Sequence, residues 1–213
     1  MRGLAGIPAS VMFLIVAFGT ISDVWAQCPL NVGQINPLGC PFQESTAPVF
    51  SFYLYCVTGY GSESYDLTNG TIGVTAFEGG DSSMEVFMQT TDDFVINGPA
   101  GGSPIVFSAI LQAKVNASSE LKLFSGAVRD STDYAGALDQ TLRLTLQHSV
   151  GEHFLVSMRA FTVSVRLQGT SASGVLGFTA LPPGYSLSSC QGYAAAPVPT
   201  RPTSWGRLKQ FFR

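Results

Sequence analysis

Charged side chains are scarce in this chain of 213 residues: Asp, Glu, Lys and Arg together account for 12% of it, about half of the usual share in globular proteins. Positive charge is the scarcer kind. Between residues 27 and 197 we count 13 acidic and 6 basic residues, which gives that stretch a balance of −7. Binding of nucleic acid needs a basic footprint, so the sequence argues against nucleic acid as a partner of this stretch.

The sequence also lacks the motifs of several catalytic and metal-binding classes. It has no Gly-x-Ser-x-Gly element of a serine hydrolase and no Cys-x-x-Cys unit of a zinc site. Its only histidines, His148 and His153, flank the turn 149–152. Together with Glu152 they could bind a metal, but a hydrogen-bonded histidine at the edge of the core is the favoured interpretation. We therefore predict no catalytic residue, no cofactor and no metal site, and we classify the protein as not an enzyme.

A glycoside hydrolase is the main enzymatic alternative, because jelly-roll folds host such enzymes, which need two facing acids. The acids that could serve are Glu85, Asp92, Asp93 and Glu152. None belongs to a recognisable motif, and the neighbours Asp92 and Asp93 would point to opposite faces of a strand.

Tryptophan is absent between residues 27 and 204, although sugar-binding clefts commonly rest on aromatic platforms. Tyr60, Tyr65 and Tyr134, which we expect in or near loops, would have to replace it. A carbohydrate-binding module therefore stays as an alternative function.

Residues 1–26 have the pattern of a secretory signal peptide. Arg2 supplies the positive start, residues 11–19 form an apolar core, and Val24-Trp25-Ala26 is a small-x-Ala cleavage site. The apolar core is too short to span a bilayer comfortably. We expect cleavage after Ala26, no transmembrane span afterwards, and a secreted protein that is extracellular or lies at the cell surface.

Alternation of apolar and polar residues dominates residues 27–193. In VFSFYLYCV (49–57), PIVFSAILQAKVN (104–116) and TLRLTLQH (141–148) every second residue is apolar. A period of two with one apolar face is typical of strands that are half buried against a second layer. Turn signals such as TNGT (68–71) and LPPG (181–184) separate these segments. We predict an all-β fold, an antiparallel β-sandwich of jelly-roll-like form with about nine or ten strands.

One predicted strand changes phase along its length. Phe154, Val156 and Met158 share one face, but the next apolar set begins at Phe161 on the other parity. We expect a β-bulge near residues 159–161, or a strand that crosses between two sheets.

The four cysteines are Cys28, Cys40, Cys56 and Cys190. An even count behind a signal peptide predicts two disulfides, with three possible pairings. We favour Cys28–Cys40, which would close a loop rich in Pro and Gly, and Cys56–Cys190, which would join the first long strand to the last.

The end of the chain differs from the domain of residues 27–193. Residues 194–203 are rich in Ala and Pro and predict an extended linker. Residues 204–213 (SWGRLKQFFR) form a short basic tail in which a helix would gather apolar side chains beside positive charge. The recognition residues would be Trp205, Arg207, Leu208, Lys209, Phe212 and Arg213. We interpret the tail as a sorting, anchoring or assembly tag that a surface or matrix component reads. A tail folded back on the acidic body and a disordered end without a role are the alternatives.

Two segments, DDFVINGPAGGSPIVFSAILQAKVN (92–116) and VRLQGTSASGVLGFTALPPGYSLSSCQGY (165–193), resemble uncharacterised bacterial exported β-sandwich proteins. The resemblance covers residues 90–193. Some of those proteins carry a C-terminal sorting signal of the PEP-CTERM type. Here Pro197-Val-Pro199 and the basic end match that signal, while its Glu and its apolar helix are missing. The resemblance implies a β-sandwich and offers no catalytic residues.

We therefore expect a secreted, non-enzymatic structural, adhesive or binding module of the cell surface or extracellular matrix. The expected partner is a surface or matrix component that reads the tail, or a glycan. A carbohydrate-binding module is the first alternative function and a glycoside hydrolase the second.

Overall fold

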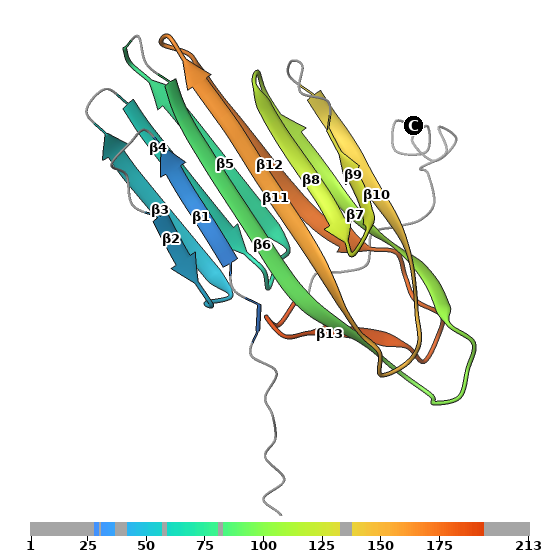
Figure 1. Ribbon diagram of the computed structural model, residues 1–213. Helices are drawn as coiled ribbons and strands as arrows, with labels where there is room; N and C mark the ends of the chain where they lie inside the picture. The colour runs from blue at the N-terminus through green and yellow to red at the C-terminus, as the bar shows by residue number, and fades with distance from the viewer. Residues whose placement is uncertain are drawn as a thin grey trace, which may run out of the picture.

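The computed structural model describes residues 28–29, 31–36, 42–56, 59–80, 83–132 and 138–193 (Figure 1). The predicted signal peptide, linker and tail lie outside these residues, as do Cys40 and Tyr134. The predictions made for them therefore stay predictions. Within the described residues there is no helix of the length and apolar character that a membrane span requires.

The described chain forms two antiparallel sheets that pack face to face, which confirms the predicted β-sandwich (Figure 1). Sheet A has the order β2 (Phe42–Ser45), β1 (Asn31–Asn36), β6 (Ser83–Asn97), β11 (His153–Val165), β8 (Ser119–Ser125) and β9 (Val128–Ser131), and β13 (Ser186–Ser189) also pairs with β6. Sheet B has the order β10 (Leu138–His148), β7 (Ile105–Val115), β12 (Gly169–Phe178), β5 (Thr71–Glu78), β4 (Gly59–Asp66) and β3 (Val49–Cys56).

The strand order is that of a jelly roll. From β5 to β7, and again from β10 to β13, successive strands alternate between the two sheets. As a result β5, β12, β7 and β10 of sheet B face β6, β11, β8 and β9 of sheet A, the interleaving that two Greek keys produce. The antiparallel hairpin of β8 and β9 completes the sheet A half of this arrangement. The thirteen described strands exceed the nine or ten that we predicted. Three of them, β2, β9 and β13, are only four residues long. A fourth, β4, has a weak pattern because it contains Gly and Ser.

The predicted alternation agrees with the observed burial. In β10 the side chains of Leu142, Leu144 and Leu146 are buried, and those of Arg143 and Thr145 between them are exposed. Strand β7 pairs with β10 over its whole length and buries every second residue in the same manner. The alternation determines which face of each strand turns inward, because only one face can reach the opposing sheet.

The predicted change of phase in β11 is wrong. Strand β11 pairs with β6 in one continuous register from His153 to Val165, without a bulge. Its inward face simply becomes small and polar: after Met158 it continues with Ala160, Thr162 and Ser164, all buried. The apolar Phe161 therefore lies on the outer face of sheet A, where it is half-buried.

The interior has an aromatic end and a polar end. At the aromatic end Phe94 contacts Phe154, Phe178 and Tyr193, with ring centroids 5.0 to 5.9 Å apart. At the other end Ser119 and Thr162 share a buried hydrogen bond of 2.6 Å between their hydroxyls. The backbone N–H of Glu78 donates to Ser164 Oγ there, at 2.8 Å.

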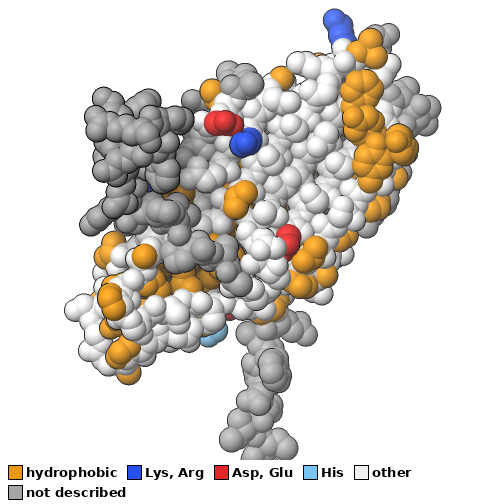
Figure 2. All heavy atoms as spheres, turned by 180° about the vertical axis from the view of Figure 1, so that it is seen from behind, with side chains coloured by type: hydrophobic (Ala, Val, Ile, Leu, Met, Phe, Trp, Pro, Cys, Tyr) orange, Lys and Arg blue, Asp and Glu red, His pale blue; other side chains and the backbone are white. Residues whose placement is uncertain are grey.

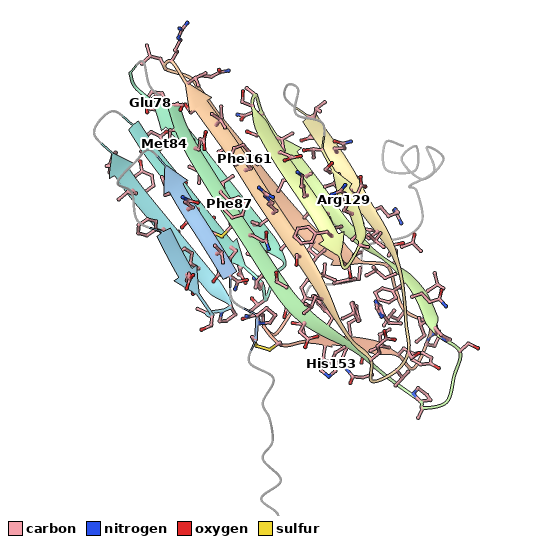
Figure 3. All side chains as sticks on the ribbon, in the orientation of Figure 1. Glu78, Met84, Phe87, Arg129, His153 and Phe161 are labelled. Carbon is pink, nitrogen blue, oxygen red and sulfur yellow. A yellow bond between two sulfur atoms is a disulfide. The ribbon has the colours of Figure 1, made fainter. Side chains whose placement is uncertain are left out.

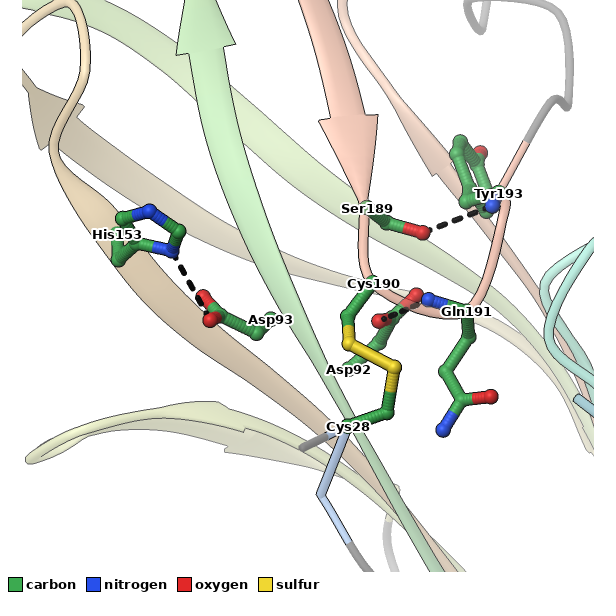
Figure 4. The surroundings of a disulfide bond; sticks show 8 residues. All are labelled: Cys28, Asp92, Asp93, His153, Ser189, Cys190, Gln191 and Tyr193. Carbon is green, nitrogen blue, oxygen red and sulfur yellow. Dashed lines mark hydrogen bonds and ion pairs between the residues drawn. A yellow bond between two sulfur atoms is a disulfide. The ribbon is translucent and has the colours of Figure 1, made fainter. Parts of the chain in front are cut away.

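Cys28 is bonded to Cys190, with the two Cα atoms 5.5 Å apart (Figure 4). Both predicted pairings are therefore wrong, since each assigned one of these cysteines to another partner. The strands explain why: the chain before β1 lies beside the end of β13, because β1 and β13 both pair with β6 on the same side. Of the three possible pairings, the one compatible with this bond would join Cys40 to Cys56, and it stays a prediction because their side chains lie outside the described part of the structure.

Candidate binding surfaces

The outer face of sheet A carries a shallow depression of about 280 Å³. Phe87 of β6 and Phe161 of β11 are direct cross-strand neighbours in it, and Gln34 of β1 lies opposite Phe87 on the other side (Figure 3). Glu85 of β6 and Arg159 of β11 complete the lining. We call these five residues the sheet A site. All of them are half-buried, so the strands fix their positions while part of each side chain stays accessible.

Arg159 lies against an aromatic ring of the sheet A site. Its guanidinium carbon lies 4.7 Å from the centroid of the Phe87 ring, which is a cation–π contact. Its Nε has no hydrogen-bond partner among the described residues and is shielded from solvent. Because this donor is shielded, an oxygen atom of a ligand would have to bind the guanidinium through its other N–H groups. The site thus combines two aromatic rings with a guanidinium, an amide and a carboxylate.

A second aromatic surface lies on the outer face of sheet B, at its β3 edge. Tyr53 and Tyr55 of β3, Tyr60 of β4 and Phe77 of β5 form a chain of ring contacts with centroids 4.9 to 6.1 Å apart. We call these four residues the tyrosine cluster. Figure 2 shows a band of hydrophobic side chains along this margin of the sheet. Tyr55 is 76% exposed and Tyr53 is 47% exposed, and a hydrogen bond with Tyr55 raises the pKa of the Tyr53 hydroxyl to about 12.

A further opening of about 420 Å³ lies where β8 and β9 meet β10 and β11. Its aromatic lining residue, Phe154, is only 5% exposed and stacks on His148 at a centroid distance of 4.2 Å. Because that ring is already covered on one face, it offers a ligand less aromatic surface than the sheet A site does.

Among the acids proposed for glycoside hydrolysis, Glu85, Asp92 and Asp93 of β6 do not form a facing pair. Glu85 precedes Asp92 by seven residues in the same extended strand, which separates their Cα atoms by roughly 23 Å, whereas catalytic acids lie about 5 to 10 Å apart. Asp92 and Asp93 point to opposite faces, as predicted. Asp92 is buried and accepts a hydrogen bond from the N–H of Gln191 at 3.0 Å, and burial raises the pKa of its carboxyl despite this bond (Figure 4).

The two histidines make hydrogen bonds with separate acids. His148 Nδ1 lies 2.9 Å from Glu152 Oε1, and the Ser149 N–H and this histidine lower the pKa of Glu152. His153 Nδ1 lies 3.0 Å from Asp93 Oδ2 on the outer face of sheet A (Figure 4). His148, stacked at the edge of the aromatic core, occupies the structural position that the sequence favoured. Among the described residues there is no group of three His, Cys, Asp or Glu side chains that could hold a metal.

The predicted tyrosines can now be placed. Tyr60 and Tyr65 lie near the two ends of β4 and so near loops, as predicted. Tyr65 is buried, and its hydroxyl donates to the carbonyl oxygen of Ala47 at 2.9 Å, so it cannot contact a ligand. Tyr60 belongs to the tyrosine cluster.

Glu63 is a buried acid that the sequence analysis did not identify. It is 0% exposed, and neither carboxylate oxygen has a hydrogen-bond partner among the described residues. Its neighbours across the sheet are Phe52 and Val74, which carry no charge. In the opposing sheet it faces Gly33, where any Cβ would overlap the carboxylate. Burial raises the pKa of Glu63 to about 7.

No family model matches the chain, and the search of curated proteins found no match. The resemblance to bacterial exported β-sandwich proteins therefore stays a prediction, and the surfaces described above are the basis for assigning a function.

Proposed function

We propose that the protein is a secreted, non-enzymatic binding module, and that the sheet A site binds a carbohydrate chain. The observation that carries the proposal is the side-by-side placement of Phe87 and Phe161 with Arg159, Glu85 and Gln34 around them. Aromatic rings stack on the apolar faces of sugar rings, and the surrounding side chains can donate to and accept from sugar hydroxyls.

The shape of the sheet A site supports a chain as the ligand. Its volume of about 280 Å³ lies just below the range of about 300 to 1,000 Å³ that is usual for small-molecule pockets. An open depression across several strands suits a segment of a longer chain that lies on the surface. Glu85 and Arg159 offset each other in charge, which favours a neutral or weakly charged polysaccharide.

Secretion supports the same function. The Cys28–Cys190 disulfide is consistent with an oxidising compartment. The predicted signal peptide would deliver the protein there, and the predicted tail would place it at a cell surface or matrix.

Replacing Phe161 with Ala is expected to weaken polysaccharide binding by about tenfold or more, because the ring supplies half of the aromatic platform. The measurement is affinity electrophoresis and pull-down with cellulose, chitin, xylan and mannan. Leu155→Ala is the matched control. It lies on the outer face of the same strand and lines the other opening, and it should bind as the wild type does. Loss of binding in Leu155→Ala with none in Phe161→Ala would assign the ligand to that other opening and contradict the proposal.

The same polysaccharides test the glycoside hydrolase alternative. No release of reducing ends is expected from the wild-type protein on prolonged incubation. Hydrolysis that disappears in Glu85→Gln would show that the sheet A site is catalytic and that the protein is an enzyme.

A further inference from the structure

The edge strand β3 differs from the other strands that end the two sheets. Sheet A ends at β2 and β9, and sheet B ends at β10 and β3; β13, which pairs only with β6, is a further edge strand but is only four residues long. Strands β2, β9 and β10 carry charge: Glu44 in β2, Arg129 and Asp130 in β9, and Asp139 and Arg143 in β10. Strand β3 reads VFSFYLYC and has no charged residue and no proline.

Proteins normally protect an edge strand with charge, proline, a bulge or a covering segment, because its free N–H and C=O groups can pair with another strand. Strand β3 pairs with β4 in an unbroken register of eight residues, so it has no bulge. Among the described strands β4 is its only partner. Its composition of aromatic and apolar residues without charge is the kind that favours strand pairing.

We propose that β3 pairs antiparallel with β3 of a second copy of this chain, so that the two B sheets join into one continuous sheet. A second copy fits this edge better than an unrelated partner because the strand is compatible with itself. With no charge on β3, pairing of like with like produces no repulsion along the ladder.

The tyrosine cluster fits the same pairing. In antiparallel strands, residues opposite each other lie on the same face of the sheet. A register centred on Leu54 sets Tyr53 opposite Tyr55 of the second copy, both on the outer face. The two clusters then form one band of rings across the two-fold axis, and the exposed rings of Tyr53 and Tyr55 gain ring contacts in addition to those within one chain.

The test is the mass of the mature protein by sedimentation equilibrium, from low micromolar to near-millimolar concentration. The wild-type protein is expected to approach twice the monomer mass. Tyr55→Lys, which places charge on the exposed side of the edge strand, is expected to stay monomeric over the whole range. The matched control is Val106→Lys, a change at a 62% exposed position of β7, which is an inner strand of the same sheet. This variant should dimerise as the wild type does.

Hydrogen exchange tests the pairing of the backbone itself. Amides of β3 in the wild-type protein are expected to exchange more slowly as the concentration rises, and those of Tyr55→Lys are not. Circular dichroism and melting curves establish that both lysine variants are folded. A wild-type protein that is monomeric at all concentrations overturns the proposal, and so does a Tyr55→Lys variant that dimerises normally. If the wild-type protein is monomeric and Tyr55→Lys loses polysaccharide binding, the tyrosine cluster is instead a ligand surface.

Discussion

Replacing Cys28 and Cys190 together with serine is expected to lower the free energy of unfolding by about 4 to 5 kcal/mol. The bond closes a loop with a sequence separation of 162 residues, and the entropy that a cross-link removes from the unfolded chain grows with loop length. In the folded protein, by comparison, the substitution removes only contacts close to the bond. Cys190 also donates its N–H to the carbonyl oxygen of Asp93 at 2.8 Å, and this contact remains in the variant.

Urea unfolding of the oxidised wild type and the double variant measures the difference. The control is the same comparison under reducing conditions, in which the stabilities of the two proteins should converge. A difference of less than about 1 kcal/mol between the oxidised proteins would show that the bond adds little stability beyond that from the pairing of β1 and β13 with β6.

Replacing Glu63 with Gln is expected to make the protein more stable at pH 8 by about 3 kcal/mol. The wild-type carboxyl is fully buried without a hydrogen-bond partner among the described residues, and burial raises its pKa from 4.5 to about 7. Each pKa unit corresponds to about 1.4 kcal/mol. The amide has nearly the same shape as the acid and carries no charge at any of these pH values.

The direction of the pH dependence follows from proton binding. Between about pH 4.5 and pH 7 the folded protein holds a proton on Glu63 that the unfolded chain has released, so the free energy of unfolding falls as the pH rises. At pH 4 the wild type and Glu63→Gln should have similar stability, and their curves should separate as the pH approaches 8. Glu44→Gln, at an exposed position of β2, is the control and should follow the wild type. Parallel curves for wild type and Glu63→Gln would contradict the burial of this carboxyl.

The sequence predicted the sandwich because most of its strands bury one face only. Strands β7 and β10 could be identified by alternation alone, since every second residue is buried and mostly apolar, although the outward positions of β7 include Val106 and Ile110. The inward face of β11 could not be predicted from hydrophobicity because its two halves bury different kinds of residues: Phe154, Val156 and Met158 first, then Thr162 and Ser164. Alternation in hydrophobicity marks an inward face only where the interior is apolar, and this interior is polar at one end.

The disulfide and the buried acid were missed for another reason, which is that both depend on contacts between distant strands. The proximity of Cys28 to Cys190 arises from β1 and β13 sharing one side of β6, a fact of topology that spacing does not contain. Glu63 is buried because Gly33, thirty residues earlier in the chain, leaves room for its carboxylate. The parity of Gly61, Glu63 and Tyr65 in GYGSESYD was the only local sign that Glu63 points inward.

The sheet A site was also only partly predicted. Glu85 was identified as an acid that could act on sugars, but Phe87, Arg159 and Phe161 were not connected with it. They meet because β6 and β11 are paired in a register that sets Phe87 opposite Phe161. The apparent change of phase at Phe161 was the available signal: a large aromatic residue on an outward parity marks an exposed surface as readily as it marks a bulge.

The two proposals can be combined and tested separately. Pairing through β3 would present two sheet A sites in one assembly, and two linked sites bind a polymer more tightly than one does. Tyr55→Lys should then weaken binding to long chains and leave binding to short oligosaccharides unchanged. Phe161→Ala should weaken both.

The most direct test of the proposed function is an NMR titration of the isotope-labelled mature protein with cellulose, chitin, xylan and mannan oligosaccharides. The proposal predicts that at least one of them shifts the amide and side-chain signals of Gln34, Phe87, Arg159 and Phe161, which come from three neighbouring strands of sheet A, while signals of the inner strands of sheet B stay in place. Shifts confined to sheet B or to the opening between β9 and β10, or no shift with any of these sugars, would contradict it.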